Sequence, residues 1–232
     1  MGFWENDVDY IVSKINGTTA IQVKSVFSHL AASEDLNEKN FSLNQINTFN
    51  TIYSELSSKL GASPIKHMCN TSGVLNYPEA HFDMVRCGIG LYGFGNSEDA
   101  TKQLKPIATL KSIISQIHKI EPNESVGYNR AYKASGYEKT ATIPIGHADG
   151  ISRNYGHKIG CVYIHGQKAP IIGNVCMDML MVDVTHVTCN EGDEVIVFGE
   201  THTAEMLANA AGTISYELLT AISQRVKRSF IN

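Results

Sequence analysis

Residues 82–93 read Phe82-Asp83-Met84-Val85-Arg86-Cys87-Gly88-Ile89-Gly90-Leu91-Tyr92-Gly93. A short apolar run is followed by an arginine and then by spaced glycines. In a parallel α/β barrel, side chains at the carboxyl ends of the strands line the site, and glycines let backbone amides approach an anion closely. Arg86 is therefore a candidate site residue, although a lone arginine more often belongs to a structural ion pair.

The sequence on both sides of Gly61 alternates between strand-like and helical patterns. Short β-branched or apolar runs lie at residues 21–27, 65–69 and 82–85. Apolar residues in helical spacing predict a helix over 42–60, with Ser42 and Gln45 as a capping box and Gly61 as its end. The order strand, helix, strand predicts parallel βα units. We interpret them as part of a TIM-like barrel.

After about Leu104 the pattern changes to many short β-branched runs with turn residues between them. These runs lie at residues 107–117, 140–145, 160–164, 169–172, 180–184 and 194–198. They predict a mostly antiparallel β domain, and helical spacing returns at 203–209 and 216–223. We therefore expect an α/β partial barrel over residues 1–103, followed by a mostly β domain over 104–232.

The composition excludes several classes of function. A net charge of −4 over 232 residues gives no basic field for nucleic acid. No apolar run approaches the ~18 residues of a membrane span, and the first residues match neither a signal peptide nor a myristoylation signal. The sequence predicts a soluble, cytoplasmic protein without a membrane partner. Five cysteines without a C-x-x-C pair favour free thiols over a zinc site.

Four further segments carry more glycine and polar residues than a simple core needs. Residues 67–72 run from a strand into a polar turn, where amides and hydroxyls can face an anion or can simply cap a helix. Tyr128 follows a glycine, and His147 lies in a loop rich in glycine. Residues 173–178 also read as a loop. Phenol and imidazole groups can transfer protons, whereas an isolated tyrosine is more often a packing residue.

Taken in order, these segments resemble the motifs of the alanine racemases, fold-type III enzymes that depend on pyridoxal phosphate. The resemblance runs through residues 1–3, 27–31, 67–71, 85–93, 126–128, 146–150, 173–178 and 212–217. It implies interconversion of L-alanine and D-alanine for peptidoglycan synthesis. It also implies a homodimer, joined head to tail.

The resemblance assigns roles to particular residues. The positions that match the family's cofactor-binding residues are Asn70, Thr71, Gly88, Ile89 and Tyr216. Arg86 matches the arginine that faces the pyridine nitrogen, and a permanent cation there cannot accept the ring proton. Racemisation needs acid/base groups on both faces of Cα, and Tyr128 matches one of them, supplied from the neighbouring subunit. Met177, His147 and Asp178 match the substrate side.

The sequence departs from the family in three ways. His147 stands where a tyrosine is usual, and Asn174 where an arginine is common. The family's Lys-Ala-x-Ala-Tyr-Gly-His-Gly segment, with the lysine that holds the cofactor, has no counterpart, and a whole barrel takes about 250 residues. We therefore expect the C-terminal portion of a racemase, inactive when isolated.

Two alternatives remain open. The chain can be a non-catalytic β module for interaction or dimerisation, or part of a racemase for serine or a larger amino acid. The joint presence of Tyr128, Arg86 and Met177 favours an enzyme. A module used only for interaction needs none of them.

Overall fold

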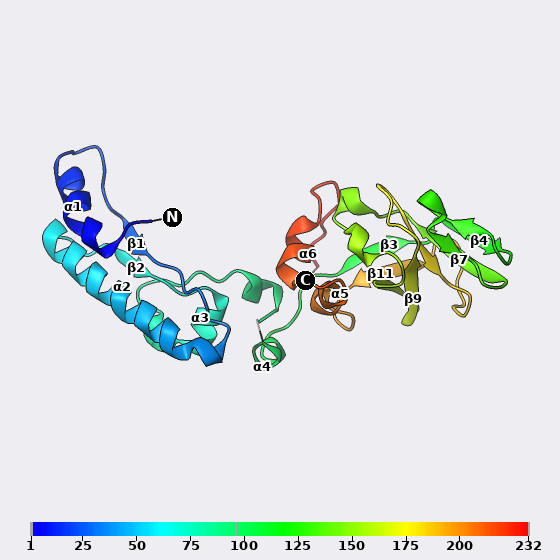
Figure 1. Cartoon of the computed structure of the whole chain (residues 1–232), viewed down its shortest axis with the longest axis horizontal. Coiled ribbons are helices and arrows are strands. Elements are labelled where there is room, and N and C mark those ends of the chain that lie inside the picture. The colour runs from blue at the N-terminus through cyan, green and yellow to red at the C-terminus, as the bar shows by residue number, and fades with distance from the viewer. Residues whose placement is uncertain (1, 96, 232) are drawn as a thin grey trace. The chain divides into compact units, whose positions relative to one another are not determined.

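The computed structural model describes residues 2–95 and 97–231. Its chain divides into two compact units, Met1–Lys105 and Pro106–Asn232. The first unit is mainly helical, and the second is built around β-strands (Figure 1).

The first unit combines two longer helices with a very small sheet. Helix α1 spans Val8–Asn16 and helix α2 spans Lys39–Leu60, and Lys59 on α2 forms an ion pair with Asp9 on α1. Strands β1 (Ser25–Phe27) and β2 (Ile65–His67) pair in parallel. The remaining elements are short: α3 (Thr71–Asn76), α4 (Glu98–Lys102) and the 3₁₀ helices η1 (Glu5–Asp7), η2 (Leu36–Glu38), η3 (Pro78–Ala80) and η4 (Ile89–Tyr92).

Helix α2 ends as predicted but begins earlier. Gly61 follows its last residue with φ of 63°, the left-handed geometry that glycine adopts without strain. The predicted capping box is wrong, because η2 leads directly into Lys39 and places Ser42 and Gln45 inside the helix. Both side chains instead contact the preceding loop: Ser42 Oγ donates to a carbonyl 3.4 Å away, and Gln45 Oε1 accepts from the N–H of Ala31.

The predicted strand over 82–85 is reduced to one parallel bridge between Met84 and His67. Phe82 has a left-handed φ of 48°, which interrupts extended backbone before the bridge. Asp83 then binds Lys66 twice: its side chain accepts from the Lys66 N–H at 2.8 Å, and its own N–H donates to the Lys66 carbonyl at 3.1 Å. A carboxylate thus takes the place of a strand carbonyl.

The core of this unit lies between α2 and the chain that follows β2. Its buried residues are Leu30, Ile46, Phe49, Met68, Cys69, Tyr77 and Ala80. Ile46 and Phe49 come from one face of α2, as their helical spacing predicts. Because Met68 and Cys69 continue directly from β2 into Asn70, this packing fixes where the polar turn begins.

The second unit is a seven-stranded sheet in the order β3-β11-β8-β9-β10-β7-β4. Its strands are β3 (Leu110–Ile113), β4 (Gln116–Ile120), β7 (Glu138–Ile143), β8 (Cys161–Ile164), β9 (Gln167–Ile172), β10 (Leu180–Asp183) and β11 (Glu194–Phe198). All neighbouring pairs are antiparallel, as predicted. The predicted run over 107–117 is divided between β3 and β4, which occupy the two ends of this order. Since only Ile114 and Ser115 separate them, the sheet must curl on itself.

A two-stranded ribbon and several short helices complete the second unit. Strands β5 (Ser125–Val126) and β6 (Tyr132–Lys133) flank the 3₁₀ helix η5 (Tyr128–Arg130). The other helices are η6 (His147–Asp149), η7 (Arg153–Tyr155), α5 (Ala204–Ala210) and α6 (Ser215–Ala221). In the described part of the chain, every helix is too short or too polar to cross a bilayer. The five cysteines are free.

Candidate functional site

Arg86 is held rigidly at the end of the small sheet in the first unit. One guanidinium nitrogen, Nη2, donates to the carbonyls of Ser28 and Met68 at 3.0 and 3.1 Å, and Nη1 lies 2.6 Å from Nδ1 of His67. The ring of Phe27 lies 5.2 Å from the guanidinium carbon. These contacts orient the cation through the last residues of β1 and β2 and the residues directly after them. Arg86 is thus fixed at the carboxyl ends of two parallel strands, where the sequence predicts it.

His67 must be neutral to make its contact with Arg86. Arginine can only donate, so Nδ1 of His67 accepts and the ring proton lies on Nε2. Burial lowers the pKa of His67, and the charge of Arg86 lowers it further. The Arg86 guanidinium keeps its protons at all ordinary pH values. It can therefore face a ring nitrogen of a bound ligand without protonating it.

Thr71 gathers the polar turn and the glycine-rich stretch into one cluster. Its buried Oγ1 accepts from the N–H groups of Gly88 and Gly90, at 3.1 and 3.2 Å. Because the oxygen accepts both bonds, its own hydrogen remains available to donate. A Cβ on Gly90 would lie 2.8 Å from a Thr71 carbon, so this close approach requires glycine.

Three of the other residues predicted to bind the cofactor, Asn70, Gly88 and Ile89, lie around this cluster. Asn70 caps α3, its Oδ1 accepting from the N–H of Gly73 at 2.9 Å. A Cβ on Gly88 would meet open space, and Ile89 is buried beneath it at the start of η4. A hydroxyl donor beside open space fits a phosphate group. Tyr216 lies in the second unit, half-buried in the first turn of α6.

Tyr128 lies on a strained, exposed loop of the second unit. Gly127, Asn129 and Arg130 all have positive φ, at 78°, 58° and 52°. Two consecutive non-glycine residues in this region are uncommon and mark a constrained turn. Asn174 secures the turn, because its Nδ2 donates to the Tyr128 carbonyl at 3.1 Å. Tyr128 is 75% exposed, and its hydroxyl bonds to none of the described residues.

Tyr128, Met177 and Asp178 line one open hollow in the second unit. Its volume is about 330 Å³, and its other lining residues are Gly127, Cys176, Met179 and Met181. Within residues 2–95 and 97–231, no backbone hydrogen bond uses the N–H of Met177 or of Asp178. Two adjacent unused N–H groups can donate to a carboxylate. The structure thus brings three of the predicted residues together.

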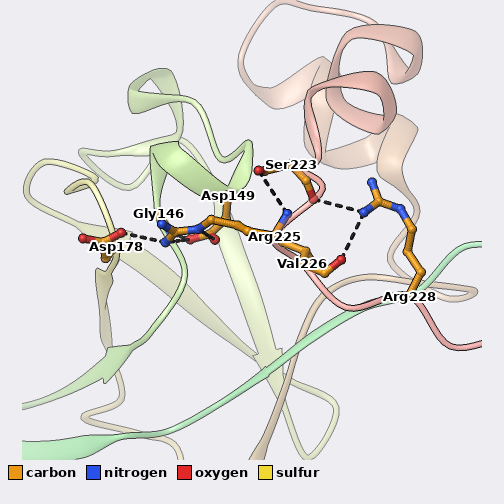
Figure 2. A network of polar contacts seen from close by, with 7 residues as sticks. All are labelled: Gly146, Asp149, Asp178, Ser223, Arg225, Val226 and Arg228. Atoms are coloured by element: carbon orange, nitrogen blue, oxygen red, sulfur yellow. Dashed lines mark hydrogen bonds and ion pairs between the residues drawn. The ribbon is translucent and has the colours of Figure 1, made fainter.

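His147 is not among the residues that line this hollow, and the Asp178 side chain already has a charged partner. The His147 side chain is exposed, while its N–H donates to the Cys176 carbonyl at 2.9 Å. The Asp178 carboxylate is already paired with Arg225, at 2.6 Å (Figure 2). Any contact of Asp178 with a carboxylate ligand would therefore come from its backbone, since like charges repel.

Sequence reasoning missed Arg225 altogether. The same guanidinium also pairs with Asp149, and its partners lie 76 and 47 residues away in the chain. No local pattern signals such a contact. The link between Asn174 and Tyr128 was missed for the same reason, although Asn174 stood out as a departure from the family.

Comparison with protein-family models identifies both parts of the chain. The model described as the alanine racemase N-terminal domain matches residues 1–95, and the C-terminal domain model matches residues 107–230. The chain belongs to the alanine racemase family. Every residue in the two clusters lies within one of these matches.

Individual alanine racemases are similar to almost the whole chain. Alanine racemase 1 of Clostridium acetobutylicum is 39% identical over 228 residues, which is 95% of this chain and 58% of the relative. The alanine racemase of Carboxydothermus hydrogenoformans is 36% identical, covering 100% of this chain and 64% of its own. The chain thus spans about three fifths of the curated relatives it matches.

Solved alanine racemase structures share the fold. The enzyme of Clostridium difficile 630, in complex with cycloserine, has a TM-score of 0.85 and 36% identity, covering 96% of this chain and 60% of that one. The enzyme of Bartonella henselae, with covalently bound pyridoxal phosphate, has a TM-score of 0.86 and 28% identity, covering 99% and 63%. The fold is therefore that of the corresponding part of an alanine racemase.

Proposed function

We propose that the protein containing this chain is a pyridoxal-phosphate-dependent alanine racemase that interconverts L-alanine and D-alanine for peptidoglycan synthesis. The proposal rests above all on the 39% identity to a named alanine racemase over 95% of the chain. The two residue clusters support it, since one presents donors for an anionic cofactor and the other presents donors for a carboxylate. The first unit would form part of a TIM-like barrel, and residues 104–232 the β domain.

The first cluster would hold the cofactor. Thr71 would donate its free hydroxyl hydrogen to the phosphate, with Asn70, Gly88 and Ile89 around it. Tyr216, from the second unit, is proposed as a further cofactor-binding residue. Arg86 would face the pyridine nitrogen, and it keeps that nitrogen unprotonated because its own proton is never released. Bound pyridoxal phosphate would supply an electron sink that makes the Cα hydrogen of the amino acid acidic.

The second cluster would bind the amino acid and move a proton. The N–H groups of Met177 and Asp178 would hold the substrate carboxylate, and His147 would lie near the entrance. Tyr128 would exchange a proton with one face of Cα. Its exposed phenol is suited to reach the cofactor of a neighbouring subunit in a head-to-tail homodimer.

The decisive experiment measures turnover by the complete protein loaded with pyridoxal phosphate. D-alanine formed from L-alanine is detected with a D-amino-acid oxidase, and L-serine is supplied in parallel. We expect racemisation, with kcat/KM for alanine above that for serine. Preference for serine would reassign the substrate. Failure to form any D-amino acid would overturn the proposal in favour of a non-catalytic module.

A further inference from the structure

Arg225 joins two loops that come from distant parts of the second unit. It lies after α6, and its Nε donates to Asp149 Oδ1 at 2.7 Å, while Nη2 donates to Asp178 Oδ1 at 2.6 Å (Figure 2). Nη2 also lies 3.4 Å from Asp149 Oδ2. One planar cation thus satisfies two carboxylates at once, which a lysine cannot do with the same geometry.

The two loops also touch through their backbones. The N–H groups of His147 and Ala148 donate to the carbonyls of Cys176 and Met177, at 2.9 and 3.0 Å. A Cβ on Gly146 would lie 2.4 Å from each of these carbonyl oxygens. The position of Met177 therefore depends directly on the loop that contains Asp149.

Asp149 is anchored independently of Arg225. It is buried, its Oδ2 accepts from the Gly146 N–H at 2.8 Å, and its carbonyl accepts from the Ser223 N–H at 3.0 Å. Burial alone would raise its pKa, but the hydrogen bonds from Arg225 and Gly146 outweigh burial and hold the pKa below its usual value. Asp178, by contrast, is exposed, so it is the end of the network that can move.

We propose that Arg225 is a positioning residue for the substrate side of the site, which fixes Asp178 and hence the N–H groups of Met177 and Asp178 against the 146–150 loop. This inference rests on the proposed racemase function. Without Arg225, two carboxylates would face each other across the gap that it now fills, and their repulsion would push the exposed 176–178 loop outward. The freed negative charges would also oppose an incoming carboxylate.

The structural arm of the test uses hydrogen exchange on the whole chain. Arg225→Gln is compared with Lys227→Gln, which removes the same charge two residues away, and with Arg228→Gln. Among residues 2–95 and 97–231, Arg228 bonds only to carbonyls of its own segment, those of Ile222, Ser223 and Val226. We expect exchange of the His147 and Ala148 amides to accelerate about tenfold in Arg225→Gln alone. Equal acceleration in Arg228→Gln would overturn the bridging role.

The functional arm uses the complete protein loaded with pyridoxal phosphate. In Arg225→Gln, KM for L-alanine should rise about tenfold or more with kcat nearly unchanged, the result expected when ground-state and transition-state binding are lost equally. Competitive inhibition by propionate should weaken in parallel, and Arg225→Lys should restore part of the loss. An unchanged KM, or a fall in kcat alone, would overturn the inference. Absence of racemase activity in the wild type would instead contradict the proposed function, and the exchange experiment would still decide whether Arg225 bridges the loops.

Discussion

The two units differ in how many of their strands are paired on both sides and in how completely their apolar side chains are buried. In the second, five of the seven strands have neighbours on both sides, and residues such as Ile143 and Val182 are completely buried. In the first, the sheet has two strands of three residues, and Phe27 on β1 is 64% exposed. Unpaired strand edges and exposed apolar side chains need a partner. The second unit therefore pairs more of its strand edges and buries its apolar strand residues more completely than the first.

The two residue clusters, one in each unit, differ in the same way. Arg86 and Thr71 in the first unit are tied to several backbone groups each, whereas Tyr128 and Met177 in the second are exposed. Rigid, multiply bonded groups suit a cofactor that stays in place, and exposed groups suit a substrate that enters and leaves. The unit with the less complete fold thus carries the cluster whose side chains make more hydrogen bonds.

The largest expected effect is a difference in hydrogen exchange between the two sheets. In the whole chain, amides of β8 and β9 should exchange at least about 1,000-fold more slowly than those of β1 and β2, because only the former require global unfolding of their unit. Exchange is followed by amide-resolved NMR or mass spectrometry. Equal protection in both sheets would contradict the conclusion that the first unit is less well paired and less well buried than the second.

A second prediction compares one variant from each cluster in the complete protein loaded with pyridoxal phosphate. Tyr128→Phe removes the hydroxyl but keeps the ring, so racemisation should slow by ~10²–10⁴-fold in both directions while cofactor retention is unchanged. Arg86→Lys loses the guanidinium fork, so it should weaken cofactor retention, measured by dialysis and absorbance.

The control for the tyrosine change is Tyr137→Phe. Tyr137 lies in the same unit, and its exposure of 78% matches the 75% of Tyr128. We expect this variant to retain full activity. Cα deuterium exchange from D₂O should persist in Tyr128→Phe for one alanine enantiomer. Equal loss for both enantiomers, or no loss, would remove Tyr128 from the proposed role.

Much of the fold was predictable from local sequence, because strand and helix periodicity are local properties. The runs at 160–164, 169–172 and 194–198 coincide closely with β8, β9 and β11, and Gly61 ends α2. The errors arose where tertiary contacts override local pattern. Ser42 looks like a cap but is buried under the preceding loop, and Asp83 substitutes its carboxylate for strand pairing.

The site was predictable only where a local motif marks a residue. Arg86 was a candidate because it lies at a strand end before spaced glycines, and the family motif pointed to Thr71; the contacts of both are consistent with those roles. Arg225 carried no signal, because its two carboxylate partners are adjacent only after folding. Likewise, the strain beside Tyr128 depends on backbone angles at Asn129 and Arg130 that neither residue type requires.

A smaller effect is expected from core deletions that compare the units. Leu180→Ala removes a completely buried side chain from the sheet of the second unit, and Ile46→Ala removes a buried side chain from α2. Each should cost about 2–5 kcal/mol of unfolding free energy in its own unit. We expect two unfolding transitions in urea, and each variant should shift only the transition of its own unit. Met179→Ala, at an exposed neighbour of Leu180, is the control and should shift neither transition measurably.

The smallest expected effect is a difference in the stability lost when two helix caps are removed. Thr203 Oγ1 caps α5 by accepting from the Met206 N–H, and Asn70 Oδ1 caps α3 by accepting from the Gly73 N–H. Asn70 Oδ1 also accepts from the hydroxyl of Ser33, which is fully buried.

Replacing either cap with alanine removes one acceptor from a helix start, so each should cost about 1 kcal/mol. Asn70→Ala should cost a further ~1–3 kcal/mol, because it deprives a buried hydroxyl of its nearest partner. Urea midpoints of the two transitions measure both losses. A double variant, Asn70→Ala with Ser33→Ala, should recover part of the additional loss. If the two caps cost the same, or if the double variant recovers nothing, the buried hydroxyl does not link α3 to the loop before η2.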